Sequence, residues 1–104
     1  MELYRIDISE PAENDLRDIV RYISTSLSEP MAALSTIDSI EEAIKKLRTM
    51  PQKYPLVMDE RLMVLGYHKL IIKNYIVFFT INEKQRVVDV ERILYKRRDW
   101  LHIL

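Results

Sequence analysis

The spacing of the apolar residues changes from a helical to a strand pattern near residue 61, and this change limits the folds available to the chain. Between residues 10 and 50 the large aliphatic residues recur every three or four positions, as on one face of an amphipathic helix. They form two groups: Leu16, Ile19, Val20, Ile23 and Leu27, followed by Leu34, Ile37, Ile40, Ile44 and Leu47. After residue 61, β-branched and aromatic residues gather in short runs that are typical of strands. Two helices should therefore precede most of the strands.

Prolines and small polar residues mark where the two helices begin and end. Ser9 is a suitable N-cap and Pro11 suits the first turn, so the first helix is predicted over roughly residues 10–27. Pro30 begins the second helix, because proline disfavours a helical residue before it, and Pro51 ends that helix. The short joint predicts an antiparallel helical hairpin. The acids of the first helix are expected to lie on its solvated face.

Four strands complete the predicted fold. The first covers residues 3–8, where apolar and charged residues alternate. Three more are predicted over residues 62–72, 75–81 and 86–95, with Gly66 at a bulge or close backbone approach inside the first of these three. The order β-α-α-β-β-β predicts an α+β fold. The helical hairpin should pack on one face of a small, mostly antiparallel sheet and leave the other face open.

The last predicted strand carries a charge on an otherwise apolar face. Strict alternation puts these residues on the face toward the helices: Val88, Val90, Arg92 and Leu94. A charge buried without a partner is costly. Arg92 is therefore expected either to form a salt bridge with Glu91 or a helix acid, or to have a functional role.

The composition predicts one compact domain, residues 1–104, in the cytoplasm. Hydrophobic residues make up 48% of the chain, no apolar run approaches the about 20 residues that span a bilayer, and the N-terminus lacks the pattern of a signal peptide. The absence of cysteine excludes disulfides, thiolate metal sites and a cysteine nucleophile. His68 and His102 lie far apart in the sequence without companion ligands, so we expect no metal and no other cofactor.

The charges are unevenly distributed, although the formal net charge is zero. Residues 1–30 hold three cations and seven anions, whereas residues 61–104 hold nine cations and four anions. The basic second half of the chain is expected to face an anionic partner. The net charge of zero disfavours a protein that binds only nucleic acid, because such proteins are usually basic overall.

The cations are densest in residues 92–100, which end in the only tryptophan. We hypothesise that six of these residues bind a target: Arg92, Tyr95, Lys96, Arg97, Arg98 and Trp100. A structural interpretation is that Arg98 pairs locally with Asp99 and that Trp100 covers the sheet or the first helix. Both interpretations remain open on the sequence alone.

Several short sequence features follow one another in a specific order along nearly the whole chain. They are YRIDISEPAENDL (residues 4–16), the breaks at Pro30 and Pro51, NYIVFFTI (residues 74–81) and RILYKRRDW (residues 92–100). Together they resemble the RelE/ParE superfamily of toxins from type II toxin–antitoxin systems. The resemblance implies the fold predicted above and a growth-inhibiting toxin of the kind associated with plasmid stabilization. It also implies a cognate antitoxin whose C-terminal segment wraps the toxin in a hetero-oligomer.

The superfamily has two main branches, which the residue after Tyr75 helps to separate. RelE-like members cleave mRNA on the ribosome without a metal and typically carry an arginine at this position, whereas ParE-like members inhibit DNA gyrase. Here the residue is Ile76, which cannot stabilise the charge that develops on a phosphate during cleavage. The ending RILYKRRDW is also closer to ParE-like endings. The resemblance therefore favours inhibition of gyrase, without a reaction catalysed by the toxin.

Two other functions remain open. One is a ribosome-dependent mRNA endonuclease that acts on the ribosome and mRNA, with cations on the phosphate and a tyrosine or histidine transferring a proton. Its candidate residues are Lys69, Arg92, Tyr95, Arg98 and His102. The other is a non-toxic module that serves only for protein–protein interaction.

Overall fold

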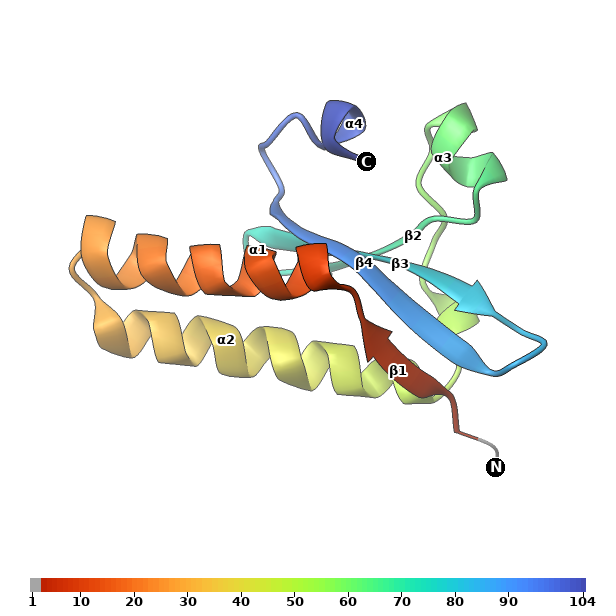
Figure 1. Cartoon of the computed structure of the whole chain (residues 1–104), viewed down its shortest axis with the longest axis horizontal. Helices are drawn as coiled ribbons and strands as arrows, with labels where there is room; N and C mark the ends of the chain where they lie inside the picture. Colours follow the sequence, from red (N-terminus) through yellow and green to blue (C-terminus); the bar gives the residue numbers. More distant parts are fainter. Residues whose placement is uncertain (1–2) are drawn as a thin grey trace.

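The computed structural model describes residues 3–104 and confirms the predicted α+β architecture (Figure 1). Its elements are β1 (Arg5–Ile8), α1 (Glu10–Arg21), α2 (Pro30–Lys45), α3 (Glu60–Val64), β2 (His68–Ile72), β3 (Tyr75–Asn82), β4 (Val87–Tyr95) and α4 (Trp100–Ile103). The four-stranded sheet has the order β1-β4-β3-β2, with β1 parallel to β4 and the other neighbours antiparallel. Within residues 3–104, no helix has the length and apolar character needed to cross a membrane.

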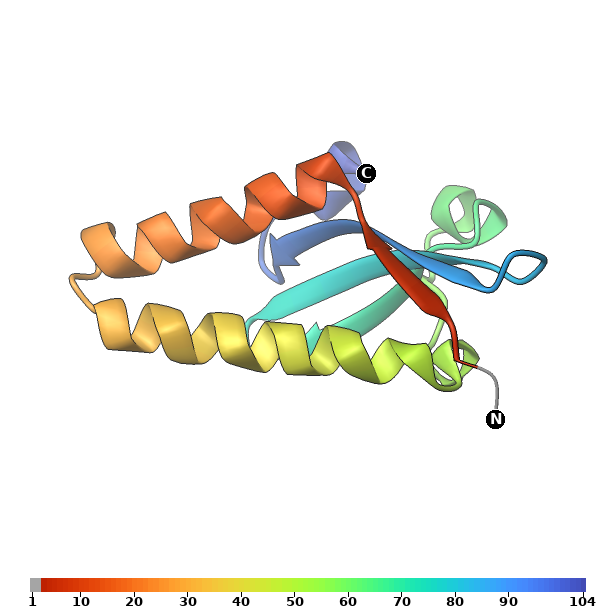
Figure 2. The same cartoon turned by 60° about the horizontal axis from the view of Figure 1, so that its bottom comes forward.

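Local sequence explains the helical hairpin. Ser9 caps α1, and its hydroxyl accepts a hydrogen bond of 3.1 Å from the Ala12 N–H. α1 continues into a π-helical turn, Tyr22–Ser26. Pro30 is the first residue of α2, which continues into a 3-10 turn, Lys46–Arg48. The two helices run along the same side of the sheet (Figure 2), as the prolines and the apolar spacing predict.

The main core lies between the hairpin and the sheet. We call the sheet surface toward the hairpin the helix face and the opposite surface the lid face. The helix face contributes Val77, Phe79, Val88, Val90 and Ile93 to this core. Ile19 of α1 and Ile40 of α2 are buried against them. Removing this apolar surface from water is the main force that holds the hairpin on the sheet.

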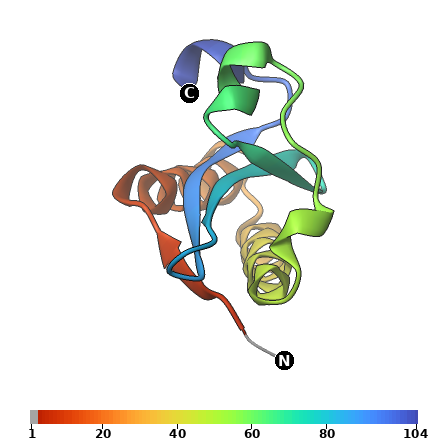
Figure 3. The same ribbon diagram turned by 90° about the vertical axis from the view of Figure 1, so that its right-hand side faces the viewer.

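The lid face is covered, so the prediction of an open face is wrong. Ile76, Phe78 and Leu94 of the sheet form a second buried cluster with Leu62 of α3, and Trp100 of α4 packs against it. Figure 3 shows α3 and α4 on the side of the sheet away from α2. The prediction failed because this cover comes from short segments that carry no extended apolar period.

The strand predicted over residues 62–72 is wrong in its first half. The Asp59 carboxylate accepts a hydrogen bond of 3.1 Å from the Leu62 N–H and caps the short helix α3. Gly66 follows α3 with a φ of +82°, in the left-handed region that glycine adopts readily. It therefore lies in the turn after a helix and not inside a strand, which begins only at His68.

β4 contains an extra residue that the alternation of the sequence does not reveal. Phe78 of β3 lies opposite Arg92, but the next residue, Phe79, lies opposite Val90. Glu91 is thus left without an opposite residue, which is the arrangement of a β-bulge.

The bulge exchanges the two faces of the last strand. Val90 faces the helices as predicted, but beyond the bulge Ile93 takes the helix face and Leu94 enters the cluster on the lid face. One inserted residue has this effect because side chains alternate with a period of two. The predicted orientation of Arg92 and Leu94 toward the helices is therefore wrong.

Candidate functional site

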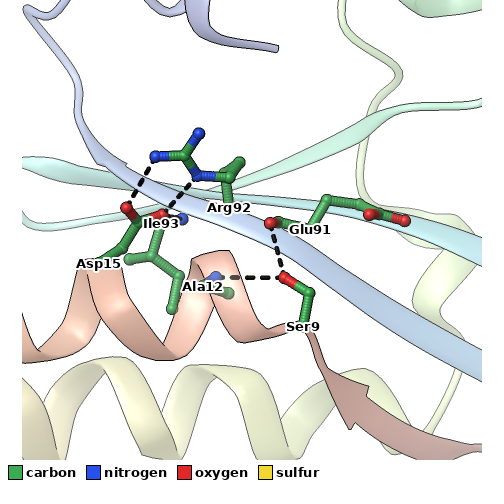
Figure 4. A network of polar contacts seen from close by, with 6 residues as sticks. All are labelled: Ser9, Ala12, Asp15, Glu91, Arg92 and Ile93. Carbon is green, nitrogen blue, oxygen red and sulfur yellow. Dashed lines mark hydrogen bonds and ion pairs between the residues drawn. The ribbon is translucent and has the colours of Figure 1, made fainter.

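Arg92 is bound to an acid of α1 where β4 passes that helix (Figure 4). Its Nε and Nη2 atoms each donate a hydrogen bond of 2.8 Å, one to each carboxylate oxygen of Asp15. The Asp15 side chain is 8% exposed and that of Arg92 is 25% exposed, so the pair is largely shielded from water. The hydrogen bond to Asp15 raises the pKa of Arg92. The structure thus pairs Arg92 with a helix acid, which is one of the partners expected from the sequence.

The same network completes the edge of β4 beyond the end of β1. β1 ends with Ile8 opposite Val90, so the next residues of β4 have no strand beside them on that side. The Ser9 hydroxyl donates to the Glu91 carbonyl (2.8 Å), and the Ile93 N–H donates to Asp15 Oδ2 (2.9 Å). Side chains from the start of α1 therefore satisfy backbone groups that a neighbouring strand would otherwise satisfy.

Three exposed cations follow β4: Lys96, Arg97 and Arg98, which we call the basic segment. Within residues 3–104 their side chains form no ion pair or hydrogen bond with the protein. The local pair expected between Arg98 and Asp99 is absent, because Asp99 instead contacts His102 (Oδ2 to Nδ1, 2.5 Å). The three charges are therefore available to an anionic surface.

Trp100 covers the lid face of the sheet. Its ring lies 5.3 Å from the ring of Phe78, with an angle of 43° between the two planes. Arg61 of α3 donates a hydrogen bond of 2.8 Å to the Leu101 carbonyl, which ties the two short helices together. Trp100 is half-buried in this arrangement. The structural interpretation of Trp100 as a cover over the sheet is confirmed.

Tyr95 lines a hollow of about 290 Å³ between the end of the sheet and α1, which we call the tyrosine hollow. Tyr22, Tyr75 and Arg98 line the same hollow. The rings of Tyr75 and Tyr95 meet edge to face, with centroids 5.8 Å apart. Burial raises the pKa of the Tyr75 phenol, as do the nearby Tyr95 and Tyr22. Tyr75 therefore remains a hydrogen-bond donor at neutral pH.

A comparison with protein-family models decides the family. Residues 6–100 match the model of the ParE toxin of type II toxin–antitoxin systems, parDE. The chain belongs to the ParE toxin family. The predicted membership of the RelE/ParE superfamily is confirmed, and so is the preference for its ParE branch.

Solved structures share the fold of this ParE toxin. The chromosomal ParDE system from P. aeruginosa is similar with a TM-score of 0.73 and 20% identity, covering 88% of this chain and 95% of that chain. The RelBE2 toxin–antitoxin complex from Mycobacterium tuberculosis gives 0.61 and 16%, covering 89% and 98%. The archaeal RelE–RelB complex from Pyrococcus horikoshii OT3 gives 0.54 and 17%, covering 91% and 97%. Among curated protein sequences, no relative matches.

The five residues of the nuclease hypothesis do not all gather at one place in this ParE toxin. Lys69 of β2 lies opposite Phe78, which in turn lies opposite Arg92, so the two cations flank Phe78 on the lid face. Trp100 covers Phe78 between them. Tyr95 packs with the core of the helix face and lines the tyrosine hollow, away from this row.

The other two residues of that hypothesis lie in the C-terminal segment. Arg98 lines the tyrosine hollow, and His102 is exposed on α4 with Asp99 as its partner. Ile76, at the position where RelE-like relatives carry an arginine, is 6% exposed inside the second cluster. Residues 3–104 also contain no group of three His, Asp or Glu side chains suited to a metal ion.

The acids of the first helix were expected to be solvated, and this prediction is wrong for Asp15, although a helix acid was one of the partners expected for Arg92. The spacing of Asp15 carried a signal, because Asp15 precedes Ile19 and Ile23 by one and two helical repeats and so shares their buried face. Tyr22 and Tyr75 carried no such signal. They belong to different elements, which meet only when the hairpin packs on the sheet.

Proposed function

We propose that this ParE toxin inhibits DNA gyrase and does not cleave mRNA. The observation that carries the proposal is the burial of Ile76 in the apolar cluster beneath α4. A nuclease without a metal needs cations placed in advance where charge develops on the phosphate. Here an aliphatic side chain occupies the relevant position, and Arg92 is already bound to Asp15. Both features favour binding over cleavage.

The basic segment is the proposed centre of the contact with gyrase. Its three side chains are exposed and have no partner within the described residues, so they can meet an anionic surface without breaking an existing ion pair. Tyr95 and Trp100 are half-buried on either side of this segment. We propose them as flanking contacts. Arg92 is proposed to act mainly by holding β4 against α1.

We further propose that a cognate antitoxin neutralises the toxin by covering a groove beside β1. This groove has a volume of about 790 Å³ and is lined by β1, α1 and α2, with Ile6, Leu16 and Ile44 among its apolar residues. β1 is an edge strand, and such strands can pair with an extended segment of another chain. The similar structures include toxin–antitoxin systems and complexes, which supports a hetero-oligomer for this toxin.

A paired assay tests the target. Purified toxin is added to a gyrase supercoiling reaction and, in parallel, to ribosomes translating a defined mRNA. We expect loss of supercoiling while the mRNA stays intact. DNA relaxation by a type I topoisomerase, which should not change, controls for effects on the DNA itself. Codon-spaced cuts in the mRNA with normal supercoiling would overturn the proposal in favour of a RelE-like nuclease.

A growth assay separates a toxin from a non-toxic interaction module. Strong expression of the chain alone should stop growth, and co-expression of a cognate antitoxin should restore growth. Normal growth without any antitoxin, together with inactivity in both biochemical assays, would support the interaction module instead.

A further inference from the structure

The tyrosine hollow carries hydrogen-bond donors that the fold does not use. Within residues 3–104, the hydroxyls of Tyr22, Tyr75 and Tyr95 form no hydrogen bond. Within the same residues 3–104, no side-chain nitrogen or oxygen atom is buried without a hydrogen-bond partner. The hydroxyl of the otherwise buried Tyr75 must therefore reach solvent, and Tyr75 is one of the residues that line the hollow. The hollow thus offers donors to an incoming acceptor.

The charges around the hollow favour a single negative charge. The carboxylate of Asp15 already accepts three hydrogen bonds, from Arg92 and from the Ile93 N–H. The carboxylate of Asp18 lies 3.7 Å from the guanidinium of Arg21. Arg98 is the cation at the hollow without a partner in the described chain, and the rest of the basic segment adds positive charge beside it.

Part of the wall of the hollow is aliphatic. Ile19 of α1 and Ile93 and Leu94 of β4 line it between the polar groups. A volume of about 290 Å³ accommodates one side chain with a short aliphatic stem. The hollow is too small and too close to Asp15 and Asp18 to favour a polyanion such as a nucleic acid strand.

Tyr22, which lines the hollow, lies at the start of an irregular helical turn. It is the first residue of the π-helical turn Tyr22–Ser26, in which the Leu27 N–H donates to the Tyr22 carbonyl five residues earlier, one residue further than in an α-helix. Such turns are uncommon and often lie at functional sites. The irregular turn and the unpaired hydroxyls therefore both indicate a functional role for the tyrosine hollow.

We infer that the tyrosine hollow is a binding site for a glutamate side chain of a protein partner. The methylene groups of the glutamate pack against Ile19 and Ile93, and its carboxylate accepts hydrogen bonds from the tyrosine hydroxyls and from Arg98. Charge-assisted hydrogen bonds of this kind are stronger than neutral ones. The inference goes beyond inhibition of gyrase, because it concerns the type of residue that the hollow recognises. It applies whichever enzyme the toxin inhibits.

An NMR titration of the full-length toxin, labelled on its tyrosine rings, tests the site. The probe is a capped hexapeptide of leucine and glutamate, and the control probe carries glutamine in place of glutamate. Adenosine monophosphate serves as a separate phosphate probe. We expect the signals of Tyr75 and Tyr95 to shift and saturate with the glutamate peptide, and to respond much less to the other two probes.

Two substitutions with the same change of charge sharpen the test. Arg98→Gln should lower the affinity for the glutamate peptide by about tenfold, since it removes a charge-assisted hydrogen bond. Arg17→Gln, on the exposed surface of α1, should leave the affinity unchanged, because Arg17 contacts Asn14 and does not line the hollow. Both residues are exposed, so both variants are expected to fold. Tyr95→Phe should also lower the affinity for the glutamate peptide, since it removes one hydroxyl and keeps the ring.

Three results would overturn the inference. One is an equal response to the glutamate and glutamine peptides, or no saturable shift with either. Another is an equal loss of affinity in Arg98→Gln and Arg17→Gln, which would indicate general electrostatic attraction. The third is tighter binding of adenosine monophosphate at the same tyrosine signals, which would assign the hollow to a phosphate.

Discussion

Asp15 links two parts of the chain that are distant in sequence. Its carboxylate binds the guanidinium of Arg92 and the backbone N–H of Ile93 at the same time. A buried acid is costly unless all its acceptor sites are used. Here the acid both compensates the charge of Arg92 and takes the place of a strand beside β4. The network therefore holds the end of β4, which precedes the basic segment, in position relative to α1.

Replacing Asp15 with alanine is expected to lower the free energy of unfolding by about 3 kcal/mol, because it leaves the Arg92 guanidinium without a counter-ion and the Ile93 N–H without an acceptor. Urea unfolding measures the change. Asp18→Ala is the matched control, since Asp18 is an exposed acid on the same helix, and its effect should stay within about 0.5 kcal/mol. Equal losses in the two variants would show that the network does not stabilise the fold.

Tyr75 makes the stability depend on pH at the alkaline end. Its pKa in the folded protein lies above the ordinary value of 10.0, mainly because of burial. The unfolded chain therefore loses this proton first, and the stability that is complete below about pH 10 should fall as the pH rises further. Urea unfolding between about pH 9 and pH 11 measures the slope. Tyr75→Phe should make the slope shallower, and an unchanged slope would exclude Tyr75 as its cause.

At the scale of elements, the bulge at Glu91 and the helix α4 together determine what the lid face presents. The bulge turns Leu94 toward this face, and α4 then places Trp100 over Phe78. The result is a second apolar cluster in place of an open sheet surface. The C-terminal segment thus stabilises the fold as well as carrying the cations of the proposed target contact.

Replacing Trp100 with alanine should detach α4 from the lid face. We expect the free energy of unfolding to fall by about 2 kcal/mol, less than for a fully buried tryptophan because Trp100 is only half-buried. Amide hydrogen exchange should also become faster at Leu104, whose N–H bonds to the Trp100 carbonyl in α4. Trp100→Phe keeps an aromatic ring over Phe78 and should restore part of the loss. Unchanged exchange in Trp100→Ala would show that other contacts hold α4.

On the scale of the whole molecule, residues 1–30 carry an excess of acids and residues 61–104 an excess of cations, although the net charge of the chain is zero. The fold leaves the basic segment exposed after β4, whereas the groove of the proposed antitoxin contact is lined by β1, α1 and α2. Because exposed charges act over roughly 10 Å at moderate salt, the basic segment should steer association more than it strengthens the final complex.

The double substitution Lys96→Gln and Arg97→Gln is expected to raise the toxin concentration for half inhibition of gyrase by about tenfold at low salt, with a smaller effect at high salt because the charges are screened. Supercoiling assays at two ionic strengths measure this difference. Lys84→Gln with Arg17→Gln is the control, since it removes two exposed cations elsewhere. A similar loss in the control would show that total charge, and not the basic segment, controls inhibition.

Features with a local cause were predictable from the sequence. Ser9, Pro30 and Pro51 mark the limits of the helical hairpin because caps and prolines act on the backbone beside them. The order of helices and strands, and hence the α+β fold, follows from the spacing of apolar residues. Ile76 and the ending of the chain pointed to the ParE branch, which the family model supports.

The tertiary structure decided what local patterns cannot encode. Alternation along β4 says nothing of an extra residue at Glu91, because a bulge is defined only by the opposing strand. The partner of Arg92 and the meeting of Tyr22 with Tyr75 likewise depend on how the hairpin packs on the sheet. By itself, the sequence determined the helical hairpin, the order of the four strands and the family that they resemble. Packing between distant elements determined which side chains remain available to a partner.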